Sequence, residues 1–97
     1  MDNQTDLPDF ITENPDGSLT VDLLRGITAD GVKQEQLTLR EPTVDDMIAA
    51  EKTAKGDQAM TEVTLLANLA GIAPADIRSA KLKDYSRLQA ALAFMNG

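Results

Sequence analysis

The sequence predicts an α+β fold, in which an N-terminal antiparallel β-hairpin precedes three or four short α-helices that form a small helical bundle. Two observations carry this prediction. Apolar residues alternate with polar ones on either side of a turn signal within residues 18–41, and they recur at helical spacing from residue 43 onward. With 97 residues, the chain is most simply one domain with a small core.

The hairpin is expected over residues 18–41. Its first half alternates as a half-buried strand does, with Leu19 and Val21 on one face. Asp30-Gly31 then gives a two-residue turn signal, because Gly accepts a positive φ. The second strand returns with leucines at positions 37 and 39. A lone hairpin is marginal in water, so it must pack on the helices.

Residues 1–17 contain two prolines, five acidic residues and no sustained period, so the sequence predicts a flexible acidic tail there. Phe10 and Ile11 are the residues of this tail that could attach to the body. The remaining residues, 18–97, are expected to form the single folded domain.

Four helices are expected in the second half, over residues 43–55, 58–70, 74–80 and 83–95. Capping residues mark their ends: Thr43 with Asp46 three residues on resembles a capping box, and Asp57 can cap the second helix. Gly71 fits a left-handed helix end, and Pro74 fits the first turn of the third helix.

Composition excludes several classes of function. The chain has 16 acidic and 9 basic residues and a net charge of -7, which disfavours binding to nucleic acid or to an anionic membrane surface. It has no cysteine and no histidine, so disulfides, thiolate chemistry, His-dependent triads and ordinary zinc sites are excluded. We therefore expect no enzyme activity, no cofactor and no metal. The acidic N-terminus is unlike a secretory signal, which favours the cytoplasm.

Acidic residues cluster where the first long helix is expected to begin: Glu41, Asp45, Asp46 and Glu51. Carboxylates in a first helical turn are stabilised by free N–H groups and by the helix dipole, so a structural role is favoured over a metal or catalytic site. A contact with a partner stays open at this junction, and we expect it to involve Arg40 and Glu41.

Two stretches resemble one known family. "QLTLREPTVDDMIAAEK", residues 36–52, is similar to the strand-to-helix junction of the tail assembly chaperones of long-tailed bacteriophages. "LLANLAGIAPADIRSAKLKDYSRLQAALAFMNG", residues 65–97, is similar to the same family in its apolar helix ending at Gly, its Pro-led short helix and its Asp-Tyr pair. With the preceding hairpin, the resemblance covers roughly residues 19–97.

The resemblance implies a small, non-enzymatic protein of a phage or prophage that acts in the host bacterial cytoplasm and is absent from the mature virion. It implies binding to the tape measure protein, which is long and helical, and help in recruiting the tail tube protein. The chain would be the short form or its N-terminal portion, and a frameshifted longer form would mediate tube recruitment. The resemblance leaves self-association open.

Two apolar stripes suggest where a helical segment of the tape measure protein could dock. The hypothesis places a groove between the helices of residues 58–70 and 83–95, lined by Val63, Leu66, Leu69, Leu88, Leu92 and Met95. The alternative is that these stripes simply pack on each other. A competing function is a small acidic regulator or nucleic-acid mimic that blocks a basic surface, whose binding would be strongly salt-sensitive.

Overall fold

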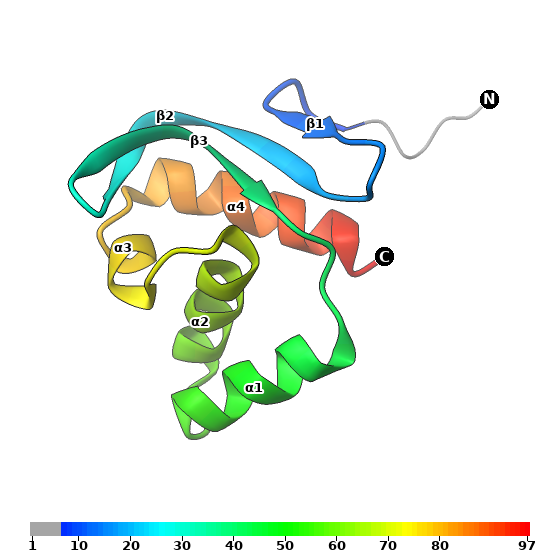
Figure 1. Cartoon of the computed structure of the whole chain (residues 1–97), viewed down its shortest axis with the longest axis vertical. Coiled ribbons are helices and arrows are strands. Elements are labelled where there is room, and N and C mark those ends of the chain that lie inside the picture. Colours follow the sequence, from blue (N-terminus) through cyan, green and yellow to red (C-terminus); the bar gives the residue numbers. More distant parts are fainter. Residues whose placement is uncertain (1–6) are drawn as a thin grey trace.

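A computed structural model describes residues 7–97 of the chain, and within them it shows three strands followed by four helices (Figure 1). This confirms the predicted α+β class. The elements are β1 (Ile11–Glu13), β2 (Leu19–Ala29), β3 (Val32–Leu39), α1 (Val44–Ala54), α2 (Gln58–Ala70), α3 (Pro74–Arg78) and α4 (Leu82–Met95).

The strands form one antiparallel sheet in the order β1-β2-β3. Asp30 and Gly31 connect β2 to β3 with φ angles of 53° and 77°, and two successive positive φ angles match the twist of a tight hairpin. Leu19 pairs with Leu39, and Val21 with Leu37. All four of these side chains are buried, so the alternation in the sequence correctly indicates the core face of the hairpin.

The segment expected as a flexible tail over residues 1–17 contains β1, which pairs with β2. Ile11 lies opposite Val21 and is only 5% exposed. The side-chain amide of Asn14 holds the returning chain, donating to the hydroxyls of Ser18 and Thr20 at 3.0 Å each. A strand of three residues is too short to show a period in the sequence. The part of the predicted tail at residues 1–6 lies outside the described residues.

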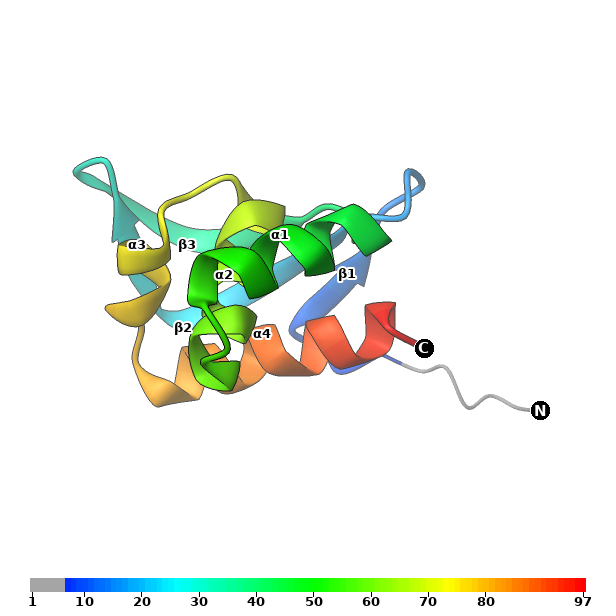
Figure 2. The ribbon, with the colours of Figure 1, turned by 90° about the horizontal axis from the view of Figure 1, so that it is seen from below.

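The helices cover one face of the sheet (Figures 1 and 2). α4 packs against β2 and α2 packs against β3, whereas α1 packs on α2, on the side away from the sheet. α2 has the predicted bounds, and α3 ends two residues earlier than predicted, at Arg78. The core between the layers joins leucines of the sheet to Leu66 of α2 and Leu88 of α4, both fully buried.

A β-bulge in β2 is held by a buried acid from α4. The ladder between β2 and β3 is interrupted between Asp22 and Ile27. There the backbone N–H groups of residues 24, 25 and 26 donate to the carboxylate of Asp84, at 2.6, 2.9 and 3.0 Å. Asp84 is fully buried. This first-turn carboxylate therefore joins α4 to the strand about 60 residues earlier, instead of capping its own helix.

Candidate partner-binding surface

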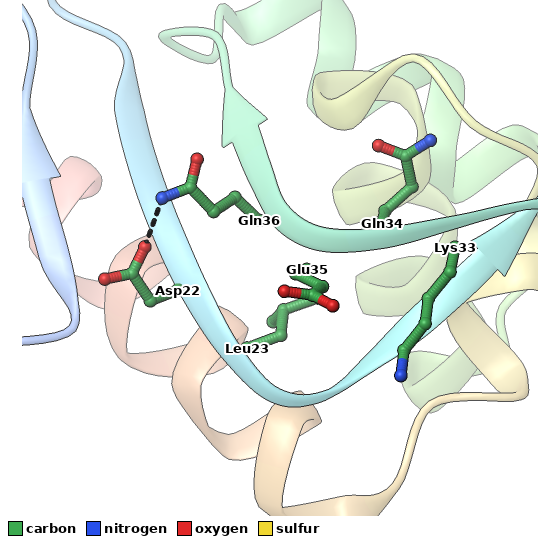
Figure 3. Close-up of a pocket in the computed structure, with 6 residues that line it drawn as sticks. All are labelled: Asp22, Leu23, Lys33, Gln34, Glu35 and Gln36. Atoms are coloured by element: carbon green, nitrogen blue, oxygen red, sulfur yellow. Dashed lines mark hydrogen bonds between the residues drawn. The ribbon is translucent and has the colours of Figure 1, made fainter.

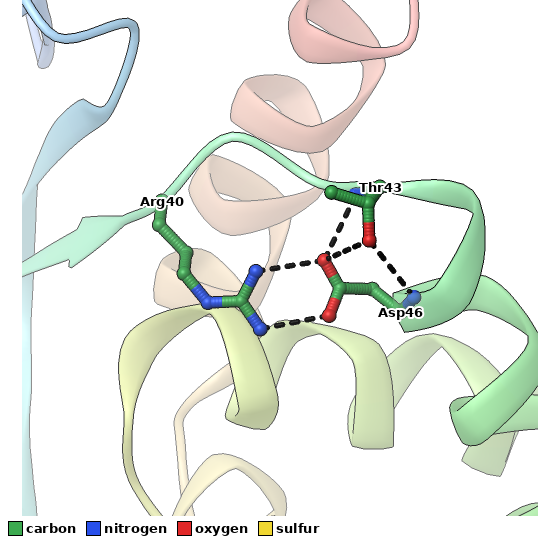
Figure 4. Close-up of polar contacts among 3 residues, drawn as sticks. All are labelled: Arg40, Thr43 and Asp46. Atoms are coloured by element: carbon green, nitrogen blue, oxygen red, sulfur yellow. Dashed lines mark hydrogen bonds and ion pairs between the residues drawn. The ribbon is translucent and has the colours of Figure 1, made fainter.

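The strand-to-helix junction is held by polar contacts among Arg40, Thr43 and Asp46 (Figure 4). The Thr43 hydroxyl accepts from the backbone N–H of Asp46 at 3.2 Å, and the Asp46 carboxylate accepts from the backbone N–H of Thr43 at 2.8 Å. This is the predicted capping box. The Arg40 guanidinium adds two parallel hydrogen bonds to the same carboxylate, at 2.7 and 2.8 Å.

The electrostatics of this junction agree with a structural role. The Arg40 hydrogen bonds, followed by the N–H bond from Thr43, hold the pKa of Asp46 well below its usual range. Arg40 is about half exposed, but its charge is paired with Asp46. Glu41 is exposed. Of the two residues expected to contact a partner here, the structure thus gives Arg40 an intramolecular partner.

The apolar stripes proposed as a groove lie mostly inside the protein. Four of their residues are buried, with exposed fractions between 0% and 6%: Leu66, Leu69, Leu88 and Leu92. These side chains belong to one core cluster with the leucines of the sheet. Val63 and Met95 are only partly buried and pack against the same cluster. Within the described residues the two stripes therefore pack into the core, and only their margins reach the surface.

The exposed apolar face of the molecule belongs to α1 instead. Val44 is 69% exposed, Met47 47% and Ile48 43%. Their i, i+3 and i+4 spacing puts them on one side of the helix. Ala50 is the one buried residue of α1. The sequence shows that these three residues share a face, but helical spacing cannot say whether that face meets the core or the solvent.

A hollow of about 350 Å³ lies beside this face. Val44 and Met47 line it from α1, Leu65 from α2, and Met95 from the end of α4. A second hollow of about 480 Å³ lies between α1 and α2 near their connection and is lined by Glu51, Gly56, Gln58 and Thr61.

The two hollows follow the same pair of helices. Met47 and Glu51 are one turn apart on α1, and Thr61 and Leu65 are one turn apart on α2. The helices diverge from the short connection between them (Figure 1). We call these two hollows together, with the residues that line them, the α1–α2 groove. Among the described residues Glu51 is the only charged side chain that lines the groove, so the hollow near the connection carries a negative charge.

A third hollow, of about 650 Å³, lies on the sheet where the β2–β3 ladder is interrupted (Figure 3). Its lining is polar and of mixed charge, and the Gln36 amide donates to the Asp22 carboxylate across it at 2.7 Å. The bulge held by Asp84 accounts for this opening. Its side chains do not converge on a common point in the way that a catalytic or ligand site requires.

Two further findings limit the chemistry within residues 7–97. No group of three or more acidic side chains there is arranged to hold a metal ion. No helix in that part of the chain is long and apolar enough to cross a membrane. What the described residues do offer is a surface, an apolar helix face beside an open groove.

The fold and this surface define a small α+β protein that presents an apolar helix face beside open hollows. The chain matches the family described as "Phage tail assembly chaperone proteins, E, or 41 or 14" over residues 20–97. The match runs from β2 to the last residue, and the chain therefore belongs to this family. No curated protein and no solved structure matches it. Membership implies a non-enzymatic role in tail assembly.

Proposed function

We propose that this protein binds the tape measure protein of its phage, keeps it soluble and helps to recruit tail tube subunits, and that the α1–α2 groove is the binding surface. The observation that carries the proposal is the outward apolar face of Val44, Met47 and Ile48 beside an open groove. The protein acts in the host cytoplasm and leaves before the virion is complete. Recruitment of tube subunits requires the longer form of the chain.

The groove suits a helix better than an extended peptide. Helix-in-groove recognition uses apolar anchors spaced by one turn, and the groove presents apolar side chains from α1, α2 and α4 around one hollow. Burying a large apolar side chain completely contributes roughly 1.5–3 kcal/mol. The α1 residues contribute less than that each, because each is already partly buried. Together they can still hold an apolar helix that would otherwise aggregate.

The charge of the protein supports this role in a second way. A net charge of -7 on 97 residues keeps a coated tape measure protein dispersed by mutual repulsion. Apolar burial persists in high salt. An acidic regulator or nucleic-acid mimic would instead release a basic partner as salt increases. Binding measured at low and at high salt therefore separates the two functions.

Co-expression with the tape measure protein of the same phage tests the proposal. We expect the wild-type chain to raise the soluble yield of the tape measure protein, and Met47→Asp combined with Ile48→Asp to abolish that gain. The matched control is Ala49→Asp with Thr53→Asp, which adds the same charge to exposed positions of α1 away from the groove.

Circular dichroism melts of both double variants verify that they are folded. An equal loss of tape measure solubility in the two double variants would mean that added charge, and not the groove, is responsible. No gain in solubility with the wild-type chain would contradict the chaperone function itself.

A further inference from the structure

Charge is distributed unevenly along this acidic chain. Residues 1–76 carry fifteen of the sixteen acidic side chains, whereas residues 77–97 carry four of the nine basic ones and a single acid, Asp84. Asp84 is fully buried and engaged with the bulge of β2. The exposed surface of the last 21 residues is therefore positive, in contrast to the rest of the molecule.

Three of these basic residues lie within four positions, in sequence, of the most exposed large apolar side chain of the described structure. Leu82 is 81% exposed at the start of α4. Lys81 and Lys83 flank it in sequence, and Arg78 ends α3 nearby. All three basic side chains are exposed, and none forms an ion pair with another residue among those described.

An apolar hollow of about 260 Å³ adjoins this leucine. Met60 and Val63 of α2, Ile77 of α3 and Tyr85 of α4 line it, together with Leu82 and Arg78. We call this hollow with Arg78, Lys81, Leu82 and Lys83 the α3–α4 corner. The corner combines an apolar cavity for one bulky side chain with three positive charges: Arg78 lines the cavity, and Lys81 and Lys83 flank Leu82 in sequence.

Two acids near the corner already accept hydrogen bonds from within the fold, one of them from Tyr85 of the corner itself. Glu62 accepts a hydrogen bond from the Tyr85 hydroxyl at 2.6 Å and another from the Gln89 amide at 2.9 Å. Asp76 accepts from the backbone N–H of Ala73 at 3.3 Å. The α4 helix also begins without a side-chain cap at Lys81, so the free N–H groups of its first turn add to the positive potential.

We propose that the α3–α4 corner docks a segment of another protein in which acidic side chains flank one bulky apolar side chain. The apolar side chain enters the hollow beside Leu82, and the flanking carboxylates pair with Arg78, Lys81 and Lys83. Charge complementarity selects this partner chemistry, because a basic segment would meet like charge at the corner.

The corner and the α1–α2 groove can be occupied together. Met60 and Val63 line the corner, whereas Thr61 and Leu65 line the groove. At 100° per residue, these pairs lie on opposite faces of α2. One copy of the protein could thus hold the tape measure protein on one side and a second, acidic protein on the other.

The test uses two synthetic 12-residue peptides, one with a central Phe flanked by two Glu on each side and one with Lys in place of each Glu. In a two-dimensional amide NMR titration of the full chain, we expect the acidic peptide to cause saturable shifts at residues 77–85 and none at residues 44–51. The Lys peptide should cause no saturable shift at the corner. The opposite pattern, or no saturable shift with either peptide, overturns the proposal.

Variants separate the corner from general electrostatics and from the proposed function. Lys81→Glu with Lys83→Glu should weaken binding of the acidic peptide at least tenfold. The control, Lys52→Glu with Lys55→Glu, changes the net charge equally and should change the affinity for this peptide less than twofold. Leu82→Ser tests the apolar contact and should lower the affinity for the acidic peptide severalfold. Equal weakening by both charge variants contradicts a site at the corner.

The corner charge variant should still solubilise the tape measure protein. If it loses that activity while remaining folded, the corner belongs to the tape measure site, and the proposal of a second partner fails while the chaperone function stands.

Discussion

The interface between the sheet and α4 is built differently from α1. At this interface, the Asp84 carboxylate accepts hydrogen bonds from three backbone N–H groups of β2. The Arg87 guanidinium donates to the Asp22 carbonyl at 2.9 Å and lies 4.5 Å from the centre of the Phe10 ring. α1 has one buried residue, packs on α2, and begins with the exposed cap made by Thr43, Asp46 and Arg40.

The difference between the two regions indicates where a substitution can change the stability of the protein without changing partner binding, and the reverse. Contacts between residues far apart in sequence hold the interface between the sheet and α4, and the Asp84 carboxylate among them is fully buried, so a change there affects the whole fold. The outer face of α1 contributes little burial, so its side chains can serve a partner at low cost to folding. Substitutions in the two regions should therefore affect different measurements.

The largest expected effect is at Asp84. Asp84→Ala leaves three backbone N–H groups of the β2 bulge without their acceptor, and we expect the free energy of unfolding to fall by about 3 kcal/mol or more. Urea denaturation followed by circular dichroism measures this. Ser86→Ala, at an exposed position of α4, is the control and should cost less than about 0.5 kcal/mol. An Asp84→Ala variant as stable as the control would show that the bulge does not depend on this carboxylate.

The second-largest loss of stability is expected at Gly26. Its φ is 84°, and a Cβ at this position would lie 2.9 Å from the backbone oxygen of Gln34. Gly26→Ala therefore combines backbone strain with a clash and should cost about 2–3 kcal/mol. Gly31 has a φ of 77° with no atom within 4 Å of its added Cβ, so Gly31→Ala isolates the strain alone. Equal losses in the two variants would mean that the close approach at the bulge adds nothing.

The cap of α1 should have a smaller and pH-dependent effect. Asp46→Ala removes the capping box and an exposed ion pair, for a loss of about 1 kcal/mol near neutral pH. Because the pKa of Asp46 is lowered in the folded state, its contribution is present above the ordinary Asp pKa and is lost as the pH falls through the lower folded value. The stability difference from wild type should thus shrink below about pH 4.

The neighbouring Asp45→Ala serves as the comparison for the cap, because Asp45 is exposed and takes no part in the capping box. A pH-independent difference at Asp46 would contradict the assignment of its stabilising contact to the charged form.

The smallest effect on stability should come from the face of α1. Met47→Asp with Ile48→Asp should change the free energy of unfolding by no more than about 0.5–1 kcal/mol, since both side chains are already nearly half exposed. The same variant is expected to lose tape measure binding completely. A loss of stability as large as that of Asp84→Ala would place this face in the core of the fold, contrary to its exposure.

Local pattern predicted most of the fold. Alternation at Leu19, Val21, Leu37 and Leu39, the Asp30-Gly31 turn and the Thr43 cap rest on contacts between residues close in sequence or on a period of two. The candidate surface was predicted less well. Leu66, Leu69, Leu88 and Leu92 were proposed to meet a partner, and the structure buries them, because a stripe at helical spacing serves a core as well as it serves a groove.

The sequence by itself determined the order of the hairpin and the four helices, the exclusion of cysteine and histidine chemistry and the resemblance to tail assembly chaperones, because each depends on residue identity and short spacing. The tertiary structure alone decided that β1 joins the sheet, that Asp84 holds the bulge of β2, and that Val44, Met47 and Ile48 face outward. These features depend on which distant segments meet, and a helix with an apolar face does not record in its own residues whether that face finds a neighbour.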